Sequence, residues 1–415
     1  MKYGLIAERV GHSFSKIIHE EIAGYSYELT AIAPDELDKF MTEREFSAIN
    51  VTIPYKQAVI PYLDYISDGA RDIGAVNTVV NKGGKLYGYN TDFFGLLSLI
   101  KKMGLSLSGK KVLILGTGGT SKTARAVASS MKASEIITVG RRAINGAIDY
   151  AEAYEKHTDA DVIINTTPVG MYPNILEKPI DISRFQRLSG VVDAVYNPMR
   201  TTLVSDALER GIRAEGGLYM LVAQAVAACE IFLDTKLPES ETDRVFSKIK
   251  ADKENIVLIG MPASGKSTIG KLVAEKTGRD FYDLDDEIVK SEGRSISEIF
   301  ATDGEAAFRD IESKVLAEKL AYLSGAVIAT GGGAILREEN VRRLKQNGRL
   351  YFLNRPLCQL LPTSDRPTAS TKEAIEKRYK ERLPIYKKSA DVELLTDGVA
   401  EHTMADIIAL HYNEV

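Results

Sequence analysis

The stretch that most constrains the fold of this chain is residues 260–268, which read Gly-Met-Pro-Ala-Ser-Gly-Lys-Ser-Thr. They follow the apolar run 255–259, which predicts a buried strand, and they precede a helical pattern. In such a loop glycines let backbone N–H groups surround phosphates, the lysine neutralises phosphate oxygens, and the hydroxyl holds magnesium. The predicted nucleotide-binding residues are Gly260, Gly265, Lys266, Ser267 and Thr268. A glycine turn that only caps a helix is the alternative, and the strand and helix around the motif favour binding of ATP or GTP.

A second glycine-rich turn follows the apolar run of "KVLILGTGGTSKTA", earlier in the chain. Its candidate cofactor-binding glycines are Gly116, Gly118 and Gly119. The sixth place of the pattern G-x-G-x-x-G is Ser121, so this motif alone is less specific. The next predicted strand is followed by Arg141 and Arg142, where NAD would need an acidic residue. The two arginines favour a phosphate and hence NADP, and two exposed loop arginines without a ligand are the alternative.

Composition limits the classes of protein that fit. The 415 residues are 44% hydrophobic, which is enough for more than one core, so about two or three domains are expected. No apolar run reaches the ~18 residues of a membrane span, and residues 1–16 lack the layout of a secretion signal, so we expect a cytoplasmic protein without membrane contact. Cys229 and Cys358 lie in different predicted domains, which fits a reducing compartment. A formal net charge of -4 predicts no nucleic-acid partner, and the scattered histidines predict no metal site.

Short β-branched runs alternate with helical stretches along the chain, which predicts an α/β fold with parallel sheets covered by helices. The expected N-terminal elements are strands at 2–8, 25–32 and 48–54, a helix at 34–41, a hairpin turning at 81–84, and a helix at 92–104 ending at Gly104. Four short apolar strands then read as βα units, at 111–116, 135–140, 161–167 and 190–196. Helices at 216–234 and 238–254 lead to a polar domain boundary near residues 251–254.

Further motifs surround the C-terminal glycine loop. Asp283 and Asp285 follow an apolar run, and a strand would place both on one side by its period of two. Another predicted strand ends in Gly331, Gly332 and Gly333, whose missing side chains let a ligand lie against the backbone. Together with "SDRPT" and "ERLPIY", these segments resemble shikimate kinase from residue 254 onward.

The kinase resemblance implies how a small cyclic acid is bound. Asp285 would accept the proton of the reacting hydroxyl, while Arg309 and Arg382 would grip the carboxylate. Bidentate guanidinium groups suit a planar carboxylate, and phosphoryl transfer depends on positioning and charge neutralisation. Solvated helix charges are the alternative for the two arginines when each is considered alone.

The same resemblance implies how the phosphates and the metal are bound. Asp283 would act with Ser267 around Mg2+, and Arg366 would close over the phosphates from a lid. The family usually carries another arginine shortly before the lid arginine, and here Gln359 lies near that place. The shorter lid predicts weaker nucleotide binding or lid closure than in the family.

The N-terminal part carries another series of motifs. In chain order these are "HSFSK", "NVTIPYK", "GAVNT", "GYNTD", "NTTPVGM", "DAVYNP" and "GLYMLVAQA". The series resembles shikimate dehydrogenase over about residues 1–250. This resemblance implies that two serines bind the substrate carboxylate and that three polar residues surround the ring hydroxyls. These residues are Ser13 and Ser15 for the carboxylate, and Thr52, Asn77 and Gln224 for the hydroxyls.

The dehydrogenase resemblance also places Lys56 and Asp92 at the reacting carbonyl. A carbonyl that receives hydride develops negative charge and needs a proton, and an adjacent ammonium supplies both stabilisation and acid chemistry. Lys56 is therefore the expected catalytic residue, with Asp92 fixing its orientation. The alternative is that Lys56 only binds substrate and the proton comes from elsewhere.

The two resemblances together imply three domains. Residues 1–107 with 218–250 would form an α/β substrate domain, 108–217 an inserted Rossmann-like NADP domain, and 254–415 a P-loop kinase domain with a parallel sheet. The implied function is a bifunctional enzyme of aromatic amino acid biosynthesis. It would reduce 3-dehydroshikimate to shikimate with NADPH, and phosphorylate shikimate to shikimate 3-phosphate with ATP and Mg2+.

Alternatives to this function stay open at the level of sequence. The kinase half would instead be a nucleotide-binding regulatory module without turnover, attached to an active dehydrogenase. Quinate is a hydroxylated relative of shikimate, and one hydroxyl changes few contacts in a binding pocket. The substrate pair of the dehydrogenase is therefore that of shikimate or that of quinate. Transfer of shikimate between the two sites without release is a further hypothesis, motivated only by the shared product.

Overall fold

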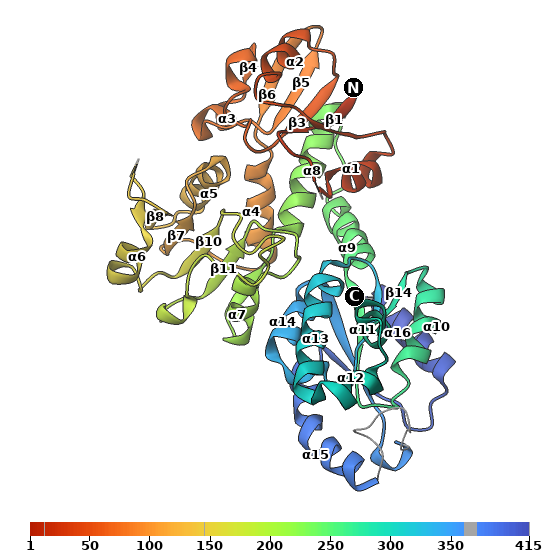
Figure 1. The fold of residues 1–415 in the computed structure, drawn as a ribbon. Helices are drawn as coiled ribbons and strands as arrows, with labels where there is room; N and C mark the ends of the chain where they lie inside the picture. Colours follow the sequence, from red (N-terminus) through yellow and green to blue (C-terminus); the bar gives the residue numbers. More distant parts are fainter. Residues whose placement is uncertain (12, 145, 361–371, 415) are drawn as a thin grey trace. The chain divides into compact units, whose positions relative to one another are not determined.

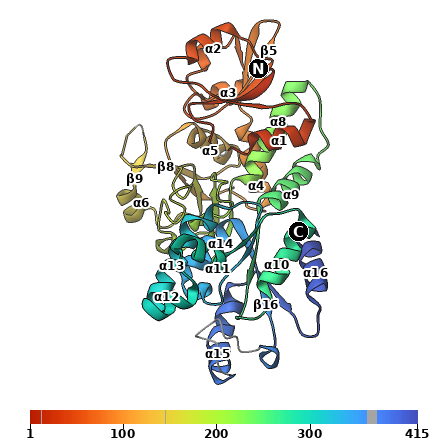
Figure 2. The same cartoon turned by 45° about the vertical axis from the view of Figure 1, so that its right-hand side comes forward.

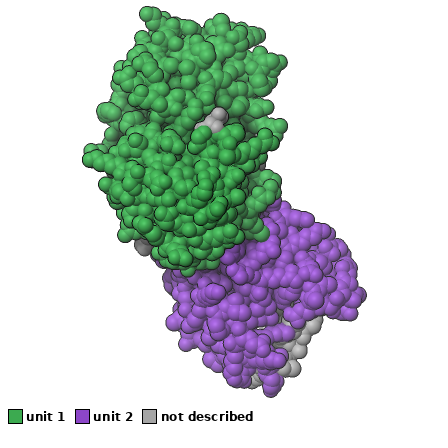
Figure 3. All heavy atoms as spheres, turned by 90° about the vertical axis from the view of Figure 1, so that its left-hand side faces the viewer, with its two compact units in different colours: residues 1–249 green, residues 250–415 purple. Residues whose placement is uncertain are grey.

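The structure is a computed structural model, which describes residues 1–415 except 12, 145, 361–371 and 415. The chain divides into two compact units, Met1–Ile249 and Lys250–Val415 (Figure 3). Each unit has its own β-sheet structure and its own hydrophobic core. No helix of the described residues is long and apolar enough to cross a membrane.

The first sheet of unit 1 contains the N-terminal strands in the order β2-β1-β3-β5-β6-β4. Its elements in chain order are β1 (Tyr3–Ala7), α1 (Ser15–Ala23), β2 (Glu28–Ala31), α2 (Leu37–Glu43), β3 (Ala48–Val51), β4 (Tyr65–Ile66), α3 (Asp68–Ile73), β5 (Thr78–Lys82) and β6 (Lys85–Tyr89). β1 pairs in parallel with β2 and β3, whereas β5 pairs antiparallel with β3 and β6. The predicted hairpin is confirmed, and it makes this sheet mixed (Figure 1).

The second sheet of unit 1 is wholly parallel, in the order β12-β11-β10-β7-β8-β9. Its elements are β7 (Lys111–Leu115), α5 (Gly119–Ser130), β8 (Glu135–Gly140), β9 (Ile148–Asp149), α6 (Tyr150–Lys156), β10 (Val162–Asn165), β11 (Gly190–Asp193), α7 (Thr202–Glu209) and β12 (Arg213–Glu215). Alternate residues of β7 lie on opposite faces of the sheet. Val112 and Ile114 pack in the same core as α5, whereas Leu113 and Leu115 pack in the same core as α7. Burial on both faces explains why these strands read as continuous apolar runs.

Two adjacent helices join the sheets of unit 1: α4 (Asp92–Lys102) and α8 (Leu218–Leu233), which lie side by side in Figures 1 and 2. The close approach depends on Gly95, where a Cβ would lie 2.5 Å from Met220 O and 3.0 Å from Gln224 Cβ. Most of α8 is buried, with Met220 in the core of the parallel sheet and Phe232 in the core of the mixed sheet. This packing brings Gln224 to the end of the strands that carry the N-terminal motifs.

Unit 2 contains one parallel sheet in the order β14-β15-β13-β16-β17. Its strands are β13 (Asn255–Ile259), β14 (Phe281–Asp283), β15 (Val327–Ala329), β16 (Gly348–Asn354) and β17 (Val392–Leu395), and its helices are α10 (Lys266–Thr277), α11 (Leu284–Glu292), α12 (Ile296–Thr302), α13 (Gly304–Glu318), α14 (Glu338–Asn347), α15 (Lys372–Ser389) and α16 (Glu401–Glu414). Ile256 and Leu258 pack against α10 and α16, which lie side by side in Figure 2. Val257 and Ile259 face the opposite core with α11 and α13. The predicted α/β class with parallel sheets is therefore confirmed in both units.

Local boundaries differ from the sequence predictions at several places. The helix expected at 34–41 begins only at Leu37, because residues 34–36 form a turn before the first helical hydrogen bonds. The helix expected at 238–254 is α9 (Glu241–Lys253), which begins three residues later than predicted, and the chain divides into its two units inside this helix, at Ile249 and Lys250. Ala251 there packs into the core of unit 2, so this end of the helix belongs to that unit.

Candidate active sites

A buried ion pair marks the first candidate site. Lys56 lies in the turn after β3, and its Nζ donates to Asp92 Oδ2 at 2.5 Å. The two side chains are 13% and 9% exposed, so the pair is largely withdrawn from water. Asp92 is the first residue of α4, and the packing of α4 holds the carboxylate in place. The structure thus brings together two predicted catalytic residues that are 36 positions apart.

Amide and hydroxyl groups form a connected network beside the first site. Asn77 is 3% exposed; its Nδ2 donates to Thr91 Oγ1 at 3.0 Å and to Gln224 Oε1 at 3.5 Å. The backbone N–H of Thr91 donates to Asn77 Oδ1 at 2.7 Å. Gln224 reaches this network from α8, while Thr52 stands at the end of β3, where its N–H donates to Ile6 O. Thr91 was not among the predicted residues, although "GYNTD" contains it.

The serine pair lies at the start of α1. Ser13 Oγ donates to Ser15 Oγ at 3.1 Å and accepts the N–H of Ser15 at 3.2 Å. Tyr196, which sequence reasoning missed, is hydrogen-bonded to Ser13, and burial raises the pKa of its hydroxyl. Its ring packs against Phe14, with centroids 5.4 Å apart. The motif "DAVYNP" contained this tyrosine, yet no local pattern connects it with the N-terminal serines.

The first glycine loop joins β7 to α5 and approaches the ion pair. Gly118 precedes the helix and Gly119 is its first residue. A Cβ at Gly119 would lie 3.6 Å from Lys56 Cδ, so the loop and the ammonium-bearing side chain are in contact distance. Gly116 has a φ of 110°, a backbone conformation that favours glycine. Ser121 is 4% exposed and takes the packed position where the dinucleotide pattern expects a small residue.

The two arginines follow the neighbouring strand β8. Arg141 and Arg142 are exposed, directly after Gly140. A Cβ at Gly140 would lie 3.0 Å from Thr117 Cγ2, which places the end of β8 against the glycine loop. The arginines therefore stand at the strand end next to the predicted cofactor loop, as β7 and β8 are adjacent in the sheet.

The second candidate site is built on the loop between β13 and α10. Lys266 is 6% exposed, and its Nζ donates to the carbonyls of Gly260 and Met261 at 2.9 Å each. Ser267 Oγ donates to Asp283 Oδ2 at 2.5 Å. Thr268 follows on the exposed side of α10. The chemistry of this site fits a metal-bound triphosphate, because a buried ammonium and adjacent hydroxyl and carboxylate oxygens surround a glycine loop.

The prediction that a strand places Asp283 and Asp285 on one side is wrong. β14 ends at Asp283, and Asp285 belongs to α11. Asp283 is the N-cap of that helix, and its Oδ1 accepts the N–H of Asp285 at 3.0 Å. A helix cap, rather than the period of a strand, therefore sets the distance between the two carboxylates. The described part of the chain holds no group of three or more His, Cys, Asp or Glu residues placed to bind a metal ion.

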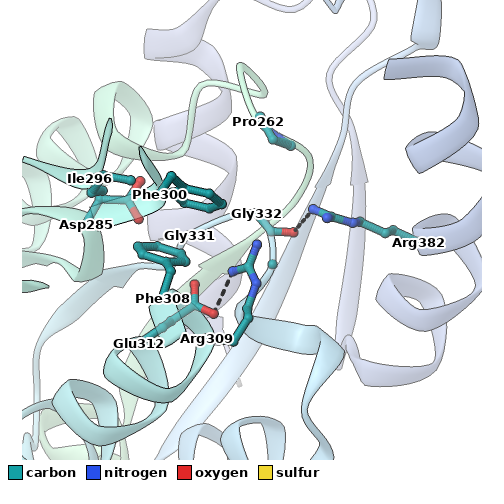
Figure 4. Close-up of a pocket in the computed structure, with 11 residues that line it drawn as sticks. Pro262, Asp285, Ile296, Phe300, Phe308, Arg309, Glu312, Gly331, Gly332 and Arg382 are labelled. Carbon is teal, nitrogen blue, oxygen red and sulfur yellow. Dashed lines mark hydrogen bonds and ion pairs between the residues drawn. The ribbon is translucent and has the colours of Figure 1, made fainter. Parts of the chain in front are cut away.

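A pocket lies beside this loop (Figure 4). Its lining residues are Pro262, Asp285, Ile296, Phe300, Phe308, Arg309, Glu312, Gly331, Gly332, Gly333 and Arg382. Arg309 Nη1 donates to Glu312 Oε2 at 2.7 Å, and Arg382 Nη1 donates to Gly332 O at 2.9 Å (Figure 4). A Cβ at Gly331 would lie 2.8 Å from Asp285 Oδ1, so the glycine turn and this carboxylate are in direct proximity. The structure brings all predicted acid-binding residues of this half into one pocket.

Two residues of this pocket region were missed by sequence reasoning. Glu312 is 1% exposed, and burial raises the pKa of its carboxyl although Arg309 opposes the shift. Tyr386 donates to Gly332 O at 2.5 Å and to Gly260 O at 2.8 Å, which ties the glycine turn to the phosphate-binding loop. The spacing of Glu312 three residues after Arg309 on a helix is the signal that could have found it.

The predicted lid is only partly covered by the structure. Arg366 lies outside the described residues. Gln359, which stands near the place of the family's further arginine, donates from Nε2 to Asp397 Oδ1 at 2.5 Å.

The two units together define an α/β protein that joins a Rossmann-like sheet with a glycine loop to a P-loop domain. Family models identify the particular family. The model of the shikimate dehydrogenase substrate binding domain matches residues 5–79, and that of shikimate kinase matches residues 262–411.

Known relatives agree with the dehydrogenase match. The shikimate dehydrogenase (NADP(+)) of Clostridium perfringens is 33% identical over 272 residues, which are 60% of this chain and 98% of the relative. The structure of shikimate dehydrogenase 1 from Peptoclostridium difficile matches with a TM-score of 0.56 and 37% identity, covering 60% of this chain and 97% of that one. The Thermus thermophilus enzyme in complex with NADP(H) and shikimate matches with a TM-score of 0.54 and 27% identity, covering 60% and 99%. The chain belongs to the shikimate dehydrogenase family and carries a shikimate kinase domain, so both predicted resemblances are confirmed.

Proposed function

We propose that the protein catalyses two reactions on one small cyclic acid. Unit 1 would reduce 3-dehydroshikimate to shikimate with NADPH, and unit 2 would phosphorylate shikimate to shikimate 3-phosphate with ATP and Mg2+. The observation that carries the proposal is that charged side chains lie directly beside a glycine loop in each unit: Lys56 next to Gly119, and Asp285 and Arg309 in the pocket next to Pro262.

In the reductase, Lys56 would act on the oxygen of the reacting carbonyl. NADPH supplies the hydride to the carbonyl carbon. The oxygen then gains negative charge, and the Lys56 ammonium stabilises that charge and donates the proton. Asp92 accepts a hydrogen bond from Nζ at 2.5 Å and so restricts the ammonium to one orientation.

The remaining polar side chains would bind the substrate of the reductase and select it. Asn77 and Gln224 hold each other through Thr91, and Thr52 completes the proposed contacts with ring hydroxyls. Ser13 and Ser15 are proposed to bind the carboxylate. Buried amide and hydroxyl groups discriminate strongly against a ligand that leaves them unpaired, which favours a polyhydroxylated ring.

In the kinase, Asp285 would accept the proton of the attacking hydroxyl, and Arg309 and Arg382 would orient the acid through its carboxylate. Lys266 would neutralise the phosphates of ATP, which supplies the phosphoryl group. Ser267 and Asp283, 2.5 Å apart, are the proposed protein ligands of Mg2+. Arg366 is proposed to close over the phosphates.

The proposal also includes the domain bounds, the residues that bind NADPH and the location of the protein. We propose domains at 1–107 with 218–250, at 108–217 and at 254–415. Arg141 and Arg142 would bind the ribose phosphate of NADPH, with Gly116, Gly118 and Gly119 at its pyrophosphate. The cytoplasm is the proposed location, because the described cysteines Cys229 and Cys358 are free thiols. Nucleic acid and membranes are not proposed as partners.

A coupled assay with the full chain tests the proposal. 3-Dehydroshikimate and NADPH alone should give shikimate, and added ATP and Mg2+ should convert it to shikimate 3-phosphate with release of ADP. NADPH oxidation without any ADP release, even with added shikimate, would favour a regulatory nucleotide-binding module instead. Faster turnover of the quinate pair than of the shikimate pair would change the proposed substrate of unit 1.

A further inference from the structure

A third arginine, Arg378, lies on the helix that carries the pocket residue Arg382, although it is not among the residues that line the pocket. Arg378 is four residues before Arg382 on α15, so both side chains emerge from one face of the helix. The Nη1 atom of Arg378 is buried, and it has no hydrogen-bond partner among the described residues. A buried guanidinium N–H without an acceptor is costly, which indicates an acceptor that the described residues do not provide.

The charges around Arg378 are those of the acid-binding end of the pocket. Burial lowers the pKa of Arg378, and the cations Arg382 and Arg309 lower it further, while Glu305 and Glu381 oppose the shift. All four neighbours belong to α13 and α15, the helices that carry the pocket arginines. None of them belongs to the phosphate-binding loop, so the missing acceptor is expected at the carboxylate and not at the nucleotide.

The other two arginines already donate within the protein. Arg309 donates to Glu312 at 2.7 Å and to Glu305 at 3.4 Å, and Arg382 donates to Gly332 O at 2.9 Å. Each of them has part of its hydrogen-bonding capacity occupied before a ligand arrives. The buried Nη1 of Arg378 can donate to a ligand oxygen without breaking a hydrogen bond to any of the described residues.

We propose that Arg378 is a third carboxylate-binding residue of the kinase pocket and that it helps select an acid over its uncharged analogues. A carboxylate has about four lone-pair directions, which is enough for three guanidinium groups. The proposal rests on the proposed function of unit 2, and it adds a residue that lies outside the motifs from which that function was inferred.

The test compares the full-length protein with its Arg378→Gln and Arg378→Lys variants. In Arg378→Gln the KM for shikimate in the kinase reaction should rise roughly 10- to 100-fold, the range for a lost charge-assisted hydrogen bond. The KM for ATP and the rate of dehydroshikimate reduction should be unchanged. Arg378→Lys should recover part of the loss, because it restores the charge without the planar fork. Lys377→Gln is the matched control, since it removes a positive charge from the adjacent, exposed position of the same helix.

A neutral substrate analogue separates carboxylate binding from a general effect on the pocket. With shikimate carboxamide, wild type and Arg378→Gln should differ by less than about 2-fold in KM, because the analogue lacks the charge that Arg378 binds. An equal loss for the acid and the carboxamide would overturn the proposal, as would a rise in the KM for ATP alone.

Calorimetric titration with shikimate distinguishes failure of this proposal from failure of the proposed function. Wild type should titrate two sites, and Arg378→Gln should weaken one of them while the other is retained. If the wild type showed no phosphoryl transfer but the variant still weakened one site, Arg378 would bind the acid and the kinase activity would be the part that is wrong. Two unchanged sites in Arg378→Gln would contradict the role of Arg378.

Discussion

The two glycine loops of this protein begin alike but differ in the source of their positive charge. Both follow a buried parallel strand, β7 or β13, and both lead into a helix. The loop of unit 2 carries its own ammonium, since Lys266 is the first residue of α10 and folds back to two carbonyls of the same loop. At the loop of unit 1 the side chain of Lys56 lies against Gly119; this lysine comes from the segment after a strand of the other sheet and is paired with Asp92.

This difference matches what each loop is proposed to do. A triphosphate concentrates charge at one place, so a lysine inside the loop stabilises it throughout phosphoryl transfer. A dinucleotide needs less charge at its pyrophosphate, where a helix N-terminus contributes, and the reacting carbonyl needs the cation instead. In the proposed reaction, separation of the two roles in unit 1 would let the Lys56 ammonium act on the substrate instead of on the phosphates.

Removal of Lys266 should produce the largest effect. Lys266→Ala is expected to lower kcat/KM of shikimate phosphorylation by about 10,000-fold, because phosphoryl transfer depends on charge neutralisation. Dehydroshikimate reduction should stay within about 2-fold of wild type, as measured by NADPH oxidation. Lys271→Ala, an exposed lysine on the same helix, is the control. Loss of both activities in a folded Lys266→Ala protein would contradict the assignment of separate loops to separate reactions.

Removal of Lys56 should give the reciprocal result with a somewhat smaller effect. Lys56→Ala is expected to lower kcat of the reductase by about 1,000-fold, the scale for loss of a proton donor that also stabilises an oxyanion. Phosphorylation of added shikimate should be unaffected. A rise in KM with an unchanged kcat would instead support the alternative in which Lys56 only binds substrate. Lys39→Ala, an exposed lysine of the same sheet domain, serves as the control.

The two units also differ in the burial of a carboxylate at the end of a strand, and this burial affects the stability of the fold. Asp283 in unit 2 is partly exposed and accepts from Ser267, whereas Asp193 at the end of β11 is fully buried. Asp193 accepts from Asn165 Nδ2 at 2.9 Å and from Thr201 Oγ1 at 2.7 Å. Burial outweighs these hydrogen bonds and raises the pKa of Asp193 from 3.8 to about 6.

The sign of the resulting pH dependence is fixed by the raised pKa. Between pH 3.8 and about pH 6, Asp193 is protonated in the folded protein but ionised in the unfolded chain. The folded protein therefore binds more protons in this range, and the free energy of unfolding decreases as the pH rises. Asp193 should contribute a decrease of about 2 to 3 kcal/mol between about pH 4 and pH 7. Urea unfolding of wild type and Asp193→Asn across this range isolates the contribution as a difference. A pH-independent difference would show that Asp193 is ionised throughout and that its hydrogen bonds outweigh burial.

The smallest expected effect concerns the exposed arginines of unit 1. Replacement of both Arg141 and Arg142 by Ser should raise the KM for NADPH roughly 10-fold and leave the KM for NADH nearly unchanged, because solvent weakens contacts at exposed sites. Arg184→Ser, an exposed arginine of the same parallel-sheet region, is the control. An equal rise in the KM for NADPH and the KM for NADH would contradict the proposal that Arg141 and Arg142 bind the ribose phosphate.

Motif reading located most of the candidate site residues because their patterns are local. The hairpin of β5 and β6 follows from alternating residues around two glycines, and both glycine loops follow from apolar runs with a fixed glycine spacing. The same local reasoning was wrong at Asp285, where a capped helix replaces the expected strand. Glu312 was missed because its importance comes from burial against Arg309, and burial depends on what other segments pack over it.

By itself, the sequence determined the class of each sheet, the two strand–loop–helix units and the residue types available to each site, because hydrophobic periodicity and glycine spacing act over a few residues. Only the tertiary structure decided which of those residues meet. Lys56 contacts Asp92, which is 36 positions away in the sequence. Asn77 contacts Gln224, which is 147 positions away, because Gly95 lets α4 pack closely against α8, the helix that carries Gln224. The burial of Arg378 Nη1 was likewise decided by packing, because the burial of an atom depends on the whole fold and not on any short stretch of chain.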